Sequence, residues 1–311
     1  MNFQAEIDHI RKFYASVDDK FVPLQNKLPQ DLFLFTTNSG IGDSLVLFLF
    51  KEHNENTKKI KTFYNPAVAN ALKKYNEYMY SIIDNSPKNA RSLFVCEIQD
   101  KIRYPGHFIQ NIQYCLGIPM QDVPRPILNN PSTTVKNRVV MTFDRGAHGQ
   151  FQTNIHPKPR ILYDEHKSTI EQFIKDNDHK YEFIEVGKTS SNIKGVINQT
   201  NLGIEKTAEL IGSCEYFFGI HNGLMHIAAA FQKKSIIIVN FPKAHEIVLP
   251  ILKRTNYPDI DWLYPQNVHL HQDEDSYLVP KLSYDSIVKA FEGNIYPYYN
   301  QSCIIEIQNY V

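Results

Sequence analysis

The sequence is poor in cysteine, has no long apolar run and carries no excess of either charge. Its four cysteines form no CxxC pair, which is typical of a reduced, cytoplasmic protein. Apolar runs stay well short of the ~20 residues of a membrane span, and the N-terminal segment has no signal-peptide core, which argues against a transmembrane or secreted protein. Lysine and arginine together number 33, as do aspartate and glutamate, so no nucleic-acid partner is expected.

The sequence does contain an alternation of short apolar strands and helices in two halves. With 311 residues, of which 42% are hydrophobic, the chain has the length of two domains of ~100–200 residues each. The proline-rich segment 121–136 is typical of an interdomain linker. We expect an N-terminal domain over residues 1–130, a C-terminal domain over 136–282, and a final helix and tail over 283–311 that pack back toward the N-terminal domain.

The expected elements follow the apolar runs. In the N-terminal half, strands are predicted over residues 31–37, 59–64 and 91–98, and helices over 45–53, 67–75 and 107–116. In the C-terminal half, strands are predicted over 138–143, 181–186, 215–220 and 235–240, and helices over 165–177, 203–213, 224–231, 244–254 and 284–292. An irregular polar segment precedes the last helix. Strands that alternate with helices predict parallel sheets covered on both faces, with ligands at the carboxyl ends of the strands.

The most informative stretch covers residues 215–242, EYFFGIHNGLMHIAAAFQKKSIIIVNFP. An apolar strand is followed by the polar turn His221, Asn222 and Gly223, and then by an alanine-rich helix. A helix that starts at such a turn forms an anion site, because free N–H groups and the positive dipole end face any phosphate there. Gly223 lets the backbone approach a ligand without a Cβ in the way. His226 lies where its side chain can look back toward the turn, so the stretch predicts a nucleotide-phosphate pocket.

Three segments carry a resemblance to a known family. Residues 38–44, NSGIGDS, residues 202–241, LGIEKTAELIGSCEYFFGIHNGLMHIAAAFQKKSIIIVNF, and the CLGIP end of residues 108–119 resemble segments of bacterial lipopolysaccharide heptosyltransferases, glycosyltransferase family 9. The resemblance implies an α/β protein of the GT-B fold, with two Rossmann-like parallel-sheet domains facing across a cleft. It implies transfer of a heptose-like or other sugar from a nucleotide-sugar donor, ADP-sugars being favoured, to a glycan or other surface-polysaccharide acceptor. The reaction would invert the anomeric centre and need no metal or cofactor.

The resemblance also implies roles for particular residues. Asp43, in an acceptor-side loop with Gly40 and Gly42, takes the position of the general base that deprotonates the acceptor hydroxyl. Gly223 and His226 take positions that hold the donor phosphates and sugar. A helix N-terminus lowers the pKa of a carboxylate, so Asp43 would be ionised at neutral pH. The residues alone leave open that Asp43 is only a helix cap and that His226 is a core histidine bonded to a backbone carbonyl.

The chain departs from the family pattern in the turn itself. His221 stands where the family has an aspartate, and Asn222 stands where it has serine or threonine. His221 could replace the lost acid, bind phosphate or merely shape the turn, and the departure puts the donor sugar in question more than the reaction class. His221 and His226 lack the i, i+4 spacing of a helical zinc pair, so no metal site is expected.

Other residues are candidates for the donor site. Arg145 and Lys158, in a loop that also holds His148 and Arg160, could cradle a diphosphate or form a solvated basic loop. Glu205 could face the nucleoside or serve as an acid in the first turn of its helix. Residues 198–200 are candidates for the base pocket. The segment 257–264, with the only tryptophan, could stack on a sugar, although packing between domains is favoured.

Two alternatives to a transferase stay open. One is a catalytically silent or divergent nucleotide-sugar-binding protein, which the replacement of the acid by His221 favours. The other is a nucleotide-sugar epimerase of the non-hydrolysing type on the same fold, whose extra acidic and histidine residues we do not find in the sequence. A cytoplasmic location is expected, and peripheral attachment at the inner face of the membrane stays open.

Overall fold

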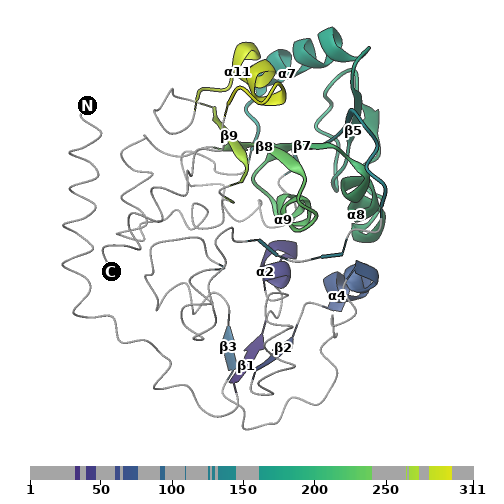
Figure 1. Ribbon diagram of the computed structural model, residues 1–311, viewed down its shortest axis with the longest axis vertical. Helices are drawn as coiled ribbons and strands as arrows, with labels where there is room; N and C mark the ends of the chain where they lie inside the picture. Colours follow the sequence, from purple (N-terminus) through teal and green to yellow (C-terminus); the bar gives the residue numbers. More distant parts are fainter. Residues whose placement is uncertain are drawn as a thin grey trace, which may run out of the picture.

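The computed structural model of the chain is an α/β arrangement in two halves (Figure 1). The structure describes residues 32–35, 40–46, 60–63, 66–75, 92–94, 109, 125–126, 128–129, 132–144, 161–239, 264, 266–272 and 280–295. The helix expected over 244–254 and most of the one expected over 107–116 lie outside these residues, and so does the loop with Arg145 and Lys158.

The C-terminal half is built on a six-stranded parallel sheet of order β6-β5-β4-β7-β8-β9. The strands are β4 (Arg138–Thr142), β5 (Glu182–Glu185), β6 (Ile197–Asn198), β7 (Tyr216–Ile220), β8 (Lys234–Val239) and β9 (Val268–His271). The chain moves outward from β4 to β5 and β6 and then returns to the other side of β4, where β7 pairs with it. Such a reversal leaves a crevice at the carboxyl ends of the strands, and ligands of open α/β sheets bind there.

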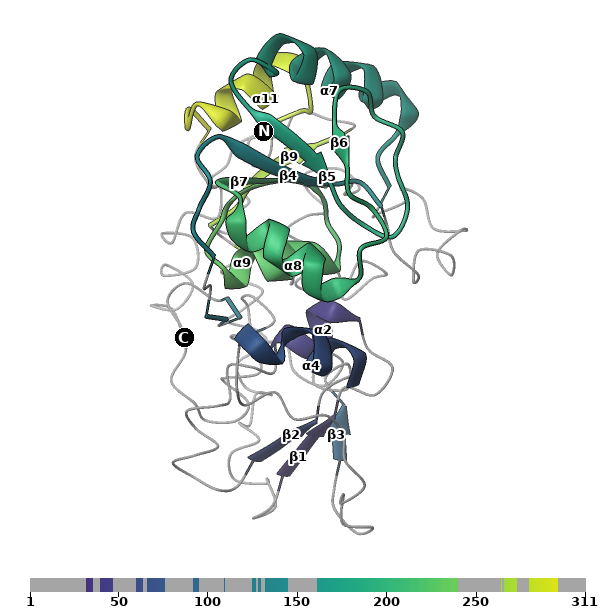
Figure 2. The same cartoon turned by 90° about the vertical axis from the view of Figure 1, so that its right-hand side faces the viewer.

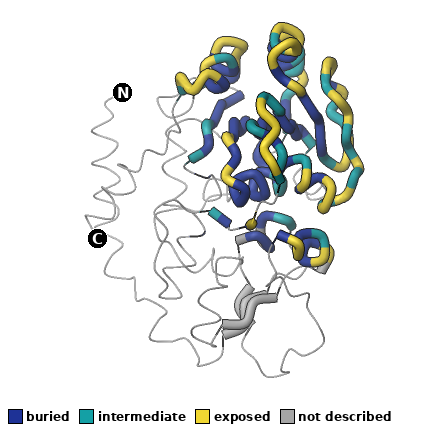
Figure 3. Tube along the Cα trace, turned by 45° about the vertical axis from the view of Figure 1, so that its right-hand side comes forward, coloured by how far each residue is buried: buried dark blue, intermediate teal, exposed yellow. Residues whose placement is uncertain are grey.

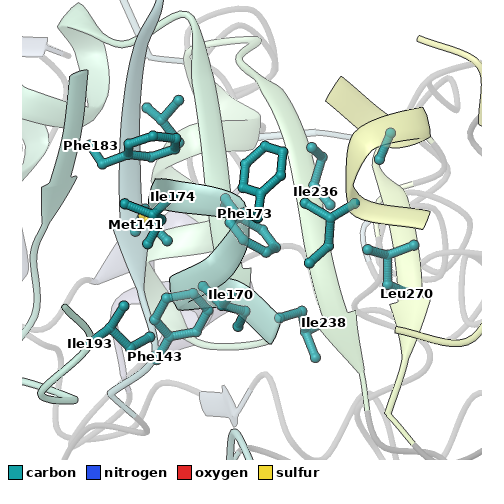
Figure 4. Packing of buried hydrophobic residues seen from close by; sticks show 14 of the residues in the cluster. Met141, Phe143, Ile170, Phe173, Ile174, Phe183, Ile193, Ile236, Ile238 and Leu270 are labelled. Atoms are coloured by element: carbon teal, nitrogen blue, oxygen red, sulfur yellow. The ribbon is translucent and has the colours of Figure 1, made fainter. Parts of the chain in front are cut away.

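One face of this sheet is covered by α7 (Asp164–Asn177) and α11 (Tyr284–Phe291), and aromatic side chains fill the space between (Figure 4). The ring centroid of Phe173 in α7 lies 4.9 Å from that of Phe291 in α11, and Phe291 lies 5.8 Å from Phe218 of β7. Burying a side chain of this size contributes ~1.5–3 kcal/mol. This core explains the near-continuous apolar runs of the central strands, which are buried on both faces.

The opposite face of the sheet carries α8 (Ile204–Ser213) and α9 (Gly223–Ala230), so the half has three layers (Figures 1 and 2). The strands between the helical layers are buried, whereas the outermost helices expose one side (Figure 3). Residues 225–230 of α9 are all buried, because α9 is covered on its outer side as well. An almost wholly apolar helix is expected to be enclosed in this way.

The N-terminal half contributes a parallel sheet of order β2-β1-β3 and short helices. Its elements are β1 (Leu32–Phe35), α2 (Ile41–Val46), β2 (Ile60–Phe63), α4 (Pro66–Leu72) with the 3-10 turn η4 (Lys73–Tyr75), and β3 (Ser92–Phe94). Helix α2 packs against α9 and α4 packs against α8, so helical layers of the two halves face each other (Figure 2). Lys74 adds ion pairs to Glu205, at 2.9 Å, and to Glu209.

The start of α2 differs from the expectation. The helix begins at Ile41 rather than at residue 45, and the Ser44 N–H donates to the Gly40 carbonyl at 3.3 Å. Gly42 and Asp43 therefore lie in the first turn of a helix and not in a flexible loop. In isolation the glycines favour a turn. In the folded protein this segment is helical, because glycines without a Cβ let the backbones of α2 and α9 approach closely and pack.

Two strands were not predicted. β6 is a two-residue edge strand with both residues exposed, so it leaves no apolar pattern. β9 has the sequence VHLH, in which His269 and His271 count as polar although the structure buries both. The alternation of the apolar residues Val268 and Leu270 is the sequence feature that could have predicted β9.

The last helix, expected to pack back toward the N-terminal domain, lies elsewhere, and the tail expected with it, residues 296–311, lies outside the described residues. α11 packs against α7 on the face of the six-stranded sheet that lies away from the N-terminal half (Figures 1 and 2). Its capping box, in which the Ser286 N–H donates to the Ser283 hydroxyl at 3.1 Å, starts the helix, and Ile287 and Phe291 supply its buried stripe. An apolar stripe shows which face of a helix is buried, but the sequence alone does not show which of the two domains that face packs against.

Candidate functional site

One asparagine connects the carboxyl ends of β4 and β7. The Asn222 amide nitrogen donates to the Thr142 hydroxyl, at 3.1 Å, and to the Asp144 carbonyl, at 2.9 Å. The Asn222 side-chain oxygen accepts from the Leu224 N–H at 2.9 Å and so caps α9. Asn222, expected to contact the donor, is thus engaged with the protein on both sides of its amide. It ties the start of α9 to the end of β4.

The cap also uses part of the expected anion site. Besides the Leu224 N–H, the Met225 N–H donates to the Asn222 carbonyl at 3.2 Å. Within the described residues, this leaves the Gly223 N–H as the first-turn donor of α9 for a ligand, together with the helix dipole. A Cβ at position 223 would lie 3.1 Å from the Ile41 Cβ, so α2 and α9 meet at their first turns.

His226, also in the first turn of α9, lies at this meeting point. Its Nδ1 and the Tyr264 hydroxyl are 2.6 Å apart, and both side chains are buried. Its other edge faces α2, since a Cβ at Gly42 would lie 2.6 Å from both Cδ2 and Nε2 of the ring. The structure thereby brings His226 together with the glycine turn that holds Asp43, whose backbone is described but whose side chain lies outside the description. The two halves of the expected site are in direct contact.

His221 lies beneath His226 in a buried cluster of imidazoles. The ring centroids of His221 and His226 are 6.1 Å apart, and the His221 N–H donates to the Ile238 carbonyl at 3.3 Å. Burial, with a smaller effect of His221, lowers the pKa of His269 to about 3. His269 is therefore neutral in the folded protein at neutral pH. The position at which the heptosyltransferase pattern has an aspartate thus holds a buried imidazole next to that of His226.

The buried neutral His269 makes stability depend on pH. Its unfolded pKa is ~6.5, so between about pH 6.5 and pH 3 the unfolded chain binds a proton that the folded chain does not. The stabilisation is complete above pH 6.5 and is lost as the pH falls, by up to ~1.4 kcal/mol per pH unit. Urea unfolding at several pH values should show a shallower acid loss in His269→Gln than in wild type. Replacement of exposed His179 is the control, and equal slopes in wild type and His269→Gln would contradict the assignment.

The remaining candidates are placed apart from this contact. Glu205 is exposed and paired with Lys74 of the N-terminal half. Gln199 lines a cavity of ≈ 550 Å³ between η4 and α8, which Lys206 and Ser213 also line. Asn198 accepts at its side-chain oxygen from the Thr200 N–H, at 3.0 Å, and so shapes its own turn.

Two residues of the site, Asp144 and His269, were not singled out from the sequence. Asp144, directly after β4, supplies the carbonyl that receives Asn222, and its carboxylate accepts from the Lys188 and Thr189 N–H groups at 2.8 and 2.9 Å. An acidic residue at the end of a strand was a usable signal. His269 comes from a segment that was expected to be irregular, and its place near His221 depends on the pairing of β9 with β8. Tyr264 ends the segment 257–264, for which packing between domains was favoured over stacking on a sugar, and its hydroxyl lies 2.6 Å from the His226 Nδ1.

Within the described ranges, no group of three metal-binding side chains comes together in a geometry that could hold an ion. No helix in the described part of the chain is long and apolar enough to cross a membrane.

No protein-family model matches the sequence, and no curated protein matches it either. Solved structures are similar in fold. The E. coli heptosyltransferase WaaC, in a structure with ADP, is 10% identical over 85% of this chain and 97% of WaaC, with a TM-score of 0.53. A glycosyl transferase of family 9 from Veillonella parvula is 10% identical over 86% of this chain and 98% of its own, with a TM-score of 0.50. TibC, an iron-containing dodecameric glycosyltransferase from enterotoxigenic E. coli, is 15% identical with a TM-score of 0.47, over 67% of this chain and 59% of TibC's length.

The alignment with WaaC runs through both halves of the chain and almost the whole of WaaC. The fold is GT-B. This confirms the fold expected from the glycine turn at residues 38–44 and from the later histidine motif. In a GT-B chain the two Rossmann-like domains face each other, and here the contact of α2 with α9 is part of that facing surface.

Proposed function

We propose that this GT-B protein is a glycosyltransferase that takes a sugar from a nucleotide-sugar donor and transfers it to a hydroxyl of a glycan acceptor. The observation that supports the proposal most is the contact of Gly42 with His226. Gly42 adjoins Asp43, the candidate base, and His226 lies in the first turn of α9, so this contact supports a site shared by the two domains. A transfer reaction needs these two groups on opposite sides of one anomeric carbon.

The proposed chemistry is a direct displacement with inversion. Asp43 accepts the proton of the acceptor hydroxyl as that oxygen attacks the anomeric carbon. The bond from this carbon to the diphosphate breaks, and the leaving group gains negative charge. The Gly223 N–H, the positive end of α9 and His226 stabilise that charge, and Arg145 and Lys158 would add cations from a loop outside the described residues. No step is assigned to a metal ion.

An ADP-sugar is the proposed donor. WaaC, whose fold this chain shares, has been crystallised with ADP and with ADP-2-deoxy-2-fluoro heptose. The turn after β7 differs, because His221 and Asn222 leave no carboxylate to accept from sugar hydroxyls. A donor sugar other than a heptose is therefore compatible with the proposal. We also propose that the protein acts at the inner face of the membrane, because that is where a surface-glycan acceptor would be.

A catalytically silent nucleotide-sugar-binding protein is the second candidate. The position of His221 favours this candidate. The side chain is only 3% exposed and lies beside His226, so it does not replace the missing carboxylate in contacts to the donor sugar. Binding without turnover would mark this alternative. The epimerase alternative gains no support, since no additional acidic cluster is found among the described residues near α9.

The proposal predicts donor-dependent stabilisation that a methyl group at Gly42 reduces. A nucleotide sugar at one hundred times its dissociation constant should add ~2.7 kcal/mol to the free energy of unfolding. In Gly42→Ala the new Cβ would lie 2.6 Å from the His226 ring, so ring and helix must separate. We expect at least tenfold weaker binding, a loss of ~1.4 kcal/mol of that stabilisation. Thermal shift with ADP-, GDP-, UDP- and CMP-sugars measures both.

Gly293→Ala is the matched control for Gly42→Ala. Gly293 follows α11 with φ +77° and has open space around it, so alanine there lowers basal stability but leaves the ligand-induced shift intact. Failure of every nucleotide sugar to stabilise the wild-type protein would overturn the proposed function. An equal ligand-induced thermal shift in Gly42→Ala and wild type would show that the contact between α2 and α9 is not part of the donor site.

A further inference from the structure

The hydrogen bond between His226 and Tyr264 joins two buried side chains from distant parts of the chain. The His226 Nδ1 and the Tyr264 hydroxyl are 2.6 Å apart, a short separation for this pair of atoms. The ring planes meet at 80° with centroids 5.4 Å apart, so the tyrosine presents its hydroxyl to the edge of the imidazole. Tyr264 is fully buried and His226 is 5% exposed, so water does not compete easily for the bond.

The chemistry of the pair sets the direction of this hydrogen bond. Burial raises the pKa of Tyr264 well above its ordinary value, so its phenol keeps the proton. A phenol is a stronger acid than the N–H of a neutral imidazole, and an imidazole nitrogen is a stronger base than a phenol oxygen. The Tyr264 O–H therefore donates to Nδ1. In a neutral imidazole the proton must then be on Nε2.

The other nitrogen of the ring faces the contact between the domains. Nε2 lies on the edge of His226 that abuts Gly42, as the 2.6 Å distance from an added Cβ shows. Gly223 lies in the same first turn of α9 and also faces α2, since a Cβ there would lie 3.1 Å from the Ile41 Cβ. An Nε2–H there is a hydrogen-bond donor, and a diphosphate is an acceptor.

We propose that Tyr264 is a positioning residue that holds His226 with its proton on Nε2, so that Nε2–H donates to the diphosphate of the donor. The inference rests on the proposed function for the ligand, but its claim on the tautomer concerns the ligand-free protein. The imidazole of His226 alone does not determine which of its two ring nitrogens carries the proton. The hydroxyl of Tyr264 makes that choice.

The first test is ¹⁵N NMR of histidine-labelled protein without ligand, with the His226 signal assigned by its loss in His226→Gln. The two tautomers differ in ¹⁵N shift, and we expect the Nε2–H form in wild type and a mixture in Tyr264→Phe. Tyr181→Phe removes a hydroxyl from another buried tyrosine, on the far side of the domain, and should change nothing. A proton on Nδ1 in wild type, or the same tautomer in Tyr264→Phe, would overturn the inference.

The second test is a double-mutant cycle on the affinity for ADP. Tyr264→Phe and His226→Gln should each weaken binding about tenfold, the size of one hydrogen bond to an ionised group. The double variant should bind no more weakly than His226→Gln, because Tyr264 acts through His226. Losses that multiply would show a separate packing role for Tyr264 and would overturn the inference. If wild type fails to bind ADP, the proposed function and the ligand assigned to Nε2 fall together, whereas the NMR result decides the tautomer by itself.

Discussion

Replacing Asp43 with asparagine should lower the rate of sugar transfer by ~10²–10⁴-fold while leaving donor binding close to that of wild type, because an amide cannot accept the proton of the acceptor hydroxyl. The substitution separates the two interpretations of this residue. Asp43 lies in the first turn of α2, where an acid contributes only ~0.3–1 kcal/mol through the helix dipole. A residue with that role alone would therefore tolerate asparagine, and a general base would not.

The measurement is release of nucleoside diphosphate from the donor, with and without acceptor, beside a thermal shift that reports binding. Asp164→Asn is the matched control, since Asp164 is an exposed acid in the first turn of α7, paired with Lys167 at 2.7 Å. Its charge is fully exposed, so removing it should change stability little and leave turnover unchanged. Turnover in Asp43→Asn equal to that of wild type would remove Asp43 from the mechanism. If the wild-type protein binds a nucleotide sugar but releases no nucleoside diphosphate, it is the catalytically silent binding protein.

Replacing Gly219 with alanine should destabilise the folded protein severely. Gly219 pairs with Thr142 in the register of β7 and β4, and an added Cβ would lie 2.2 Å from the Thr142 carbonyl oxygen. Thr142 is fully buried, so the strands must move apart in the centre of the sheet. Overpacking ordinarily costs ~1–3 kcal/mol, and a clash with backbone belongs at or above the upper end of that range.

The same movement would reach the functional site. Asn222 joins the end of β7 to Thr142 and Asp144, so separation of β4 from β7 displaces the start of α9. Urea unfolding measures the stability loss, and Gly293→Ala is the comparison. Gly293 follows α11 with φ +77° and has nothing near its added Cβ, so alanine there should cost ~1–2 kcal/mol through backbone strain alone. A Gly219→Ala protein as stable as Gly293→Ala would contradict the strand geometry.

Much of the local structure was accessible from the sequence. The apolar runs placed β4, β5, β7 and β8 and the helices α7, α8 and α9 within a few residues of their bounds. The polar turn at residues 221–223 marked the carboxyl end of a strand correctly, because a parallel strand buried on both faces needs a polar, glycine-containing exit before its helix. The positions of Asp43, Arg145 and Lys158 relative to a ligand stay predictions.

The sequence by itself determined the class of fold and the glycine turn after β7, since both follow from the period of the apolar residues and from the backbone freedom of glycine. Only the tertiary structure decided that Asn222 ties two strands together, that His226 rests on Gly42, and that Tyr264 reaches His226. These contacts join residues far apart along the chain. Local pattern specifies which face of an element is buried, but not what covers it, and here the packing of α2 on α9 and of β9 on β8 made that choice.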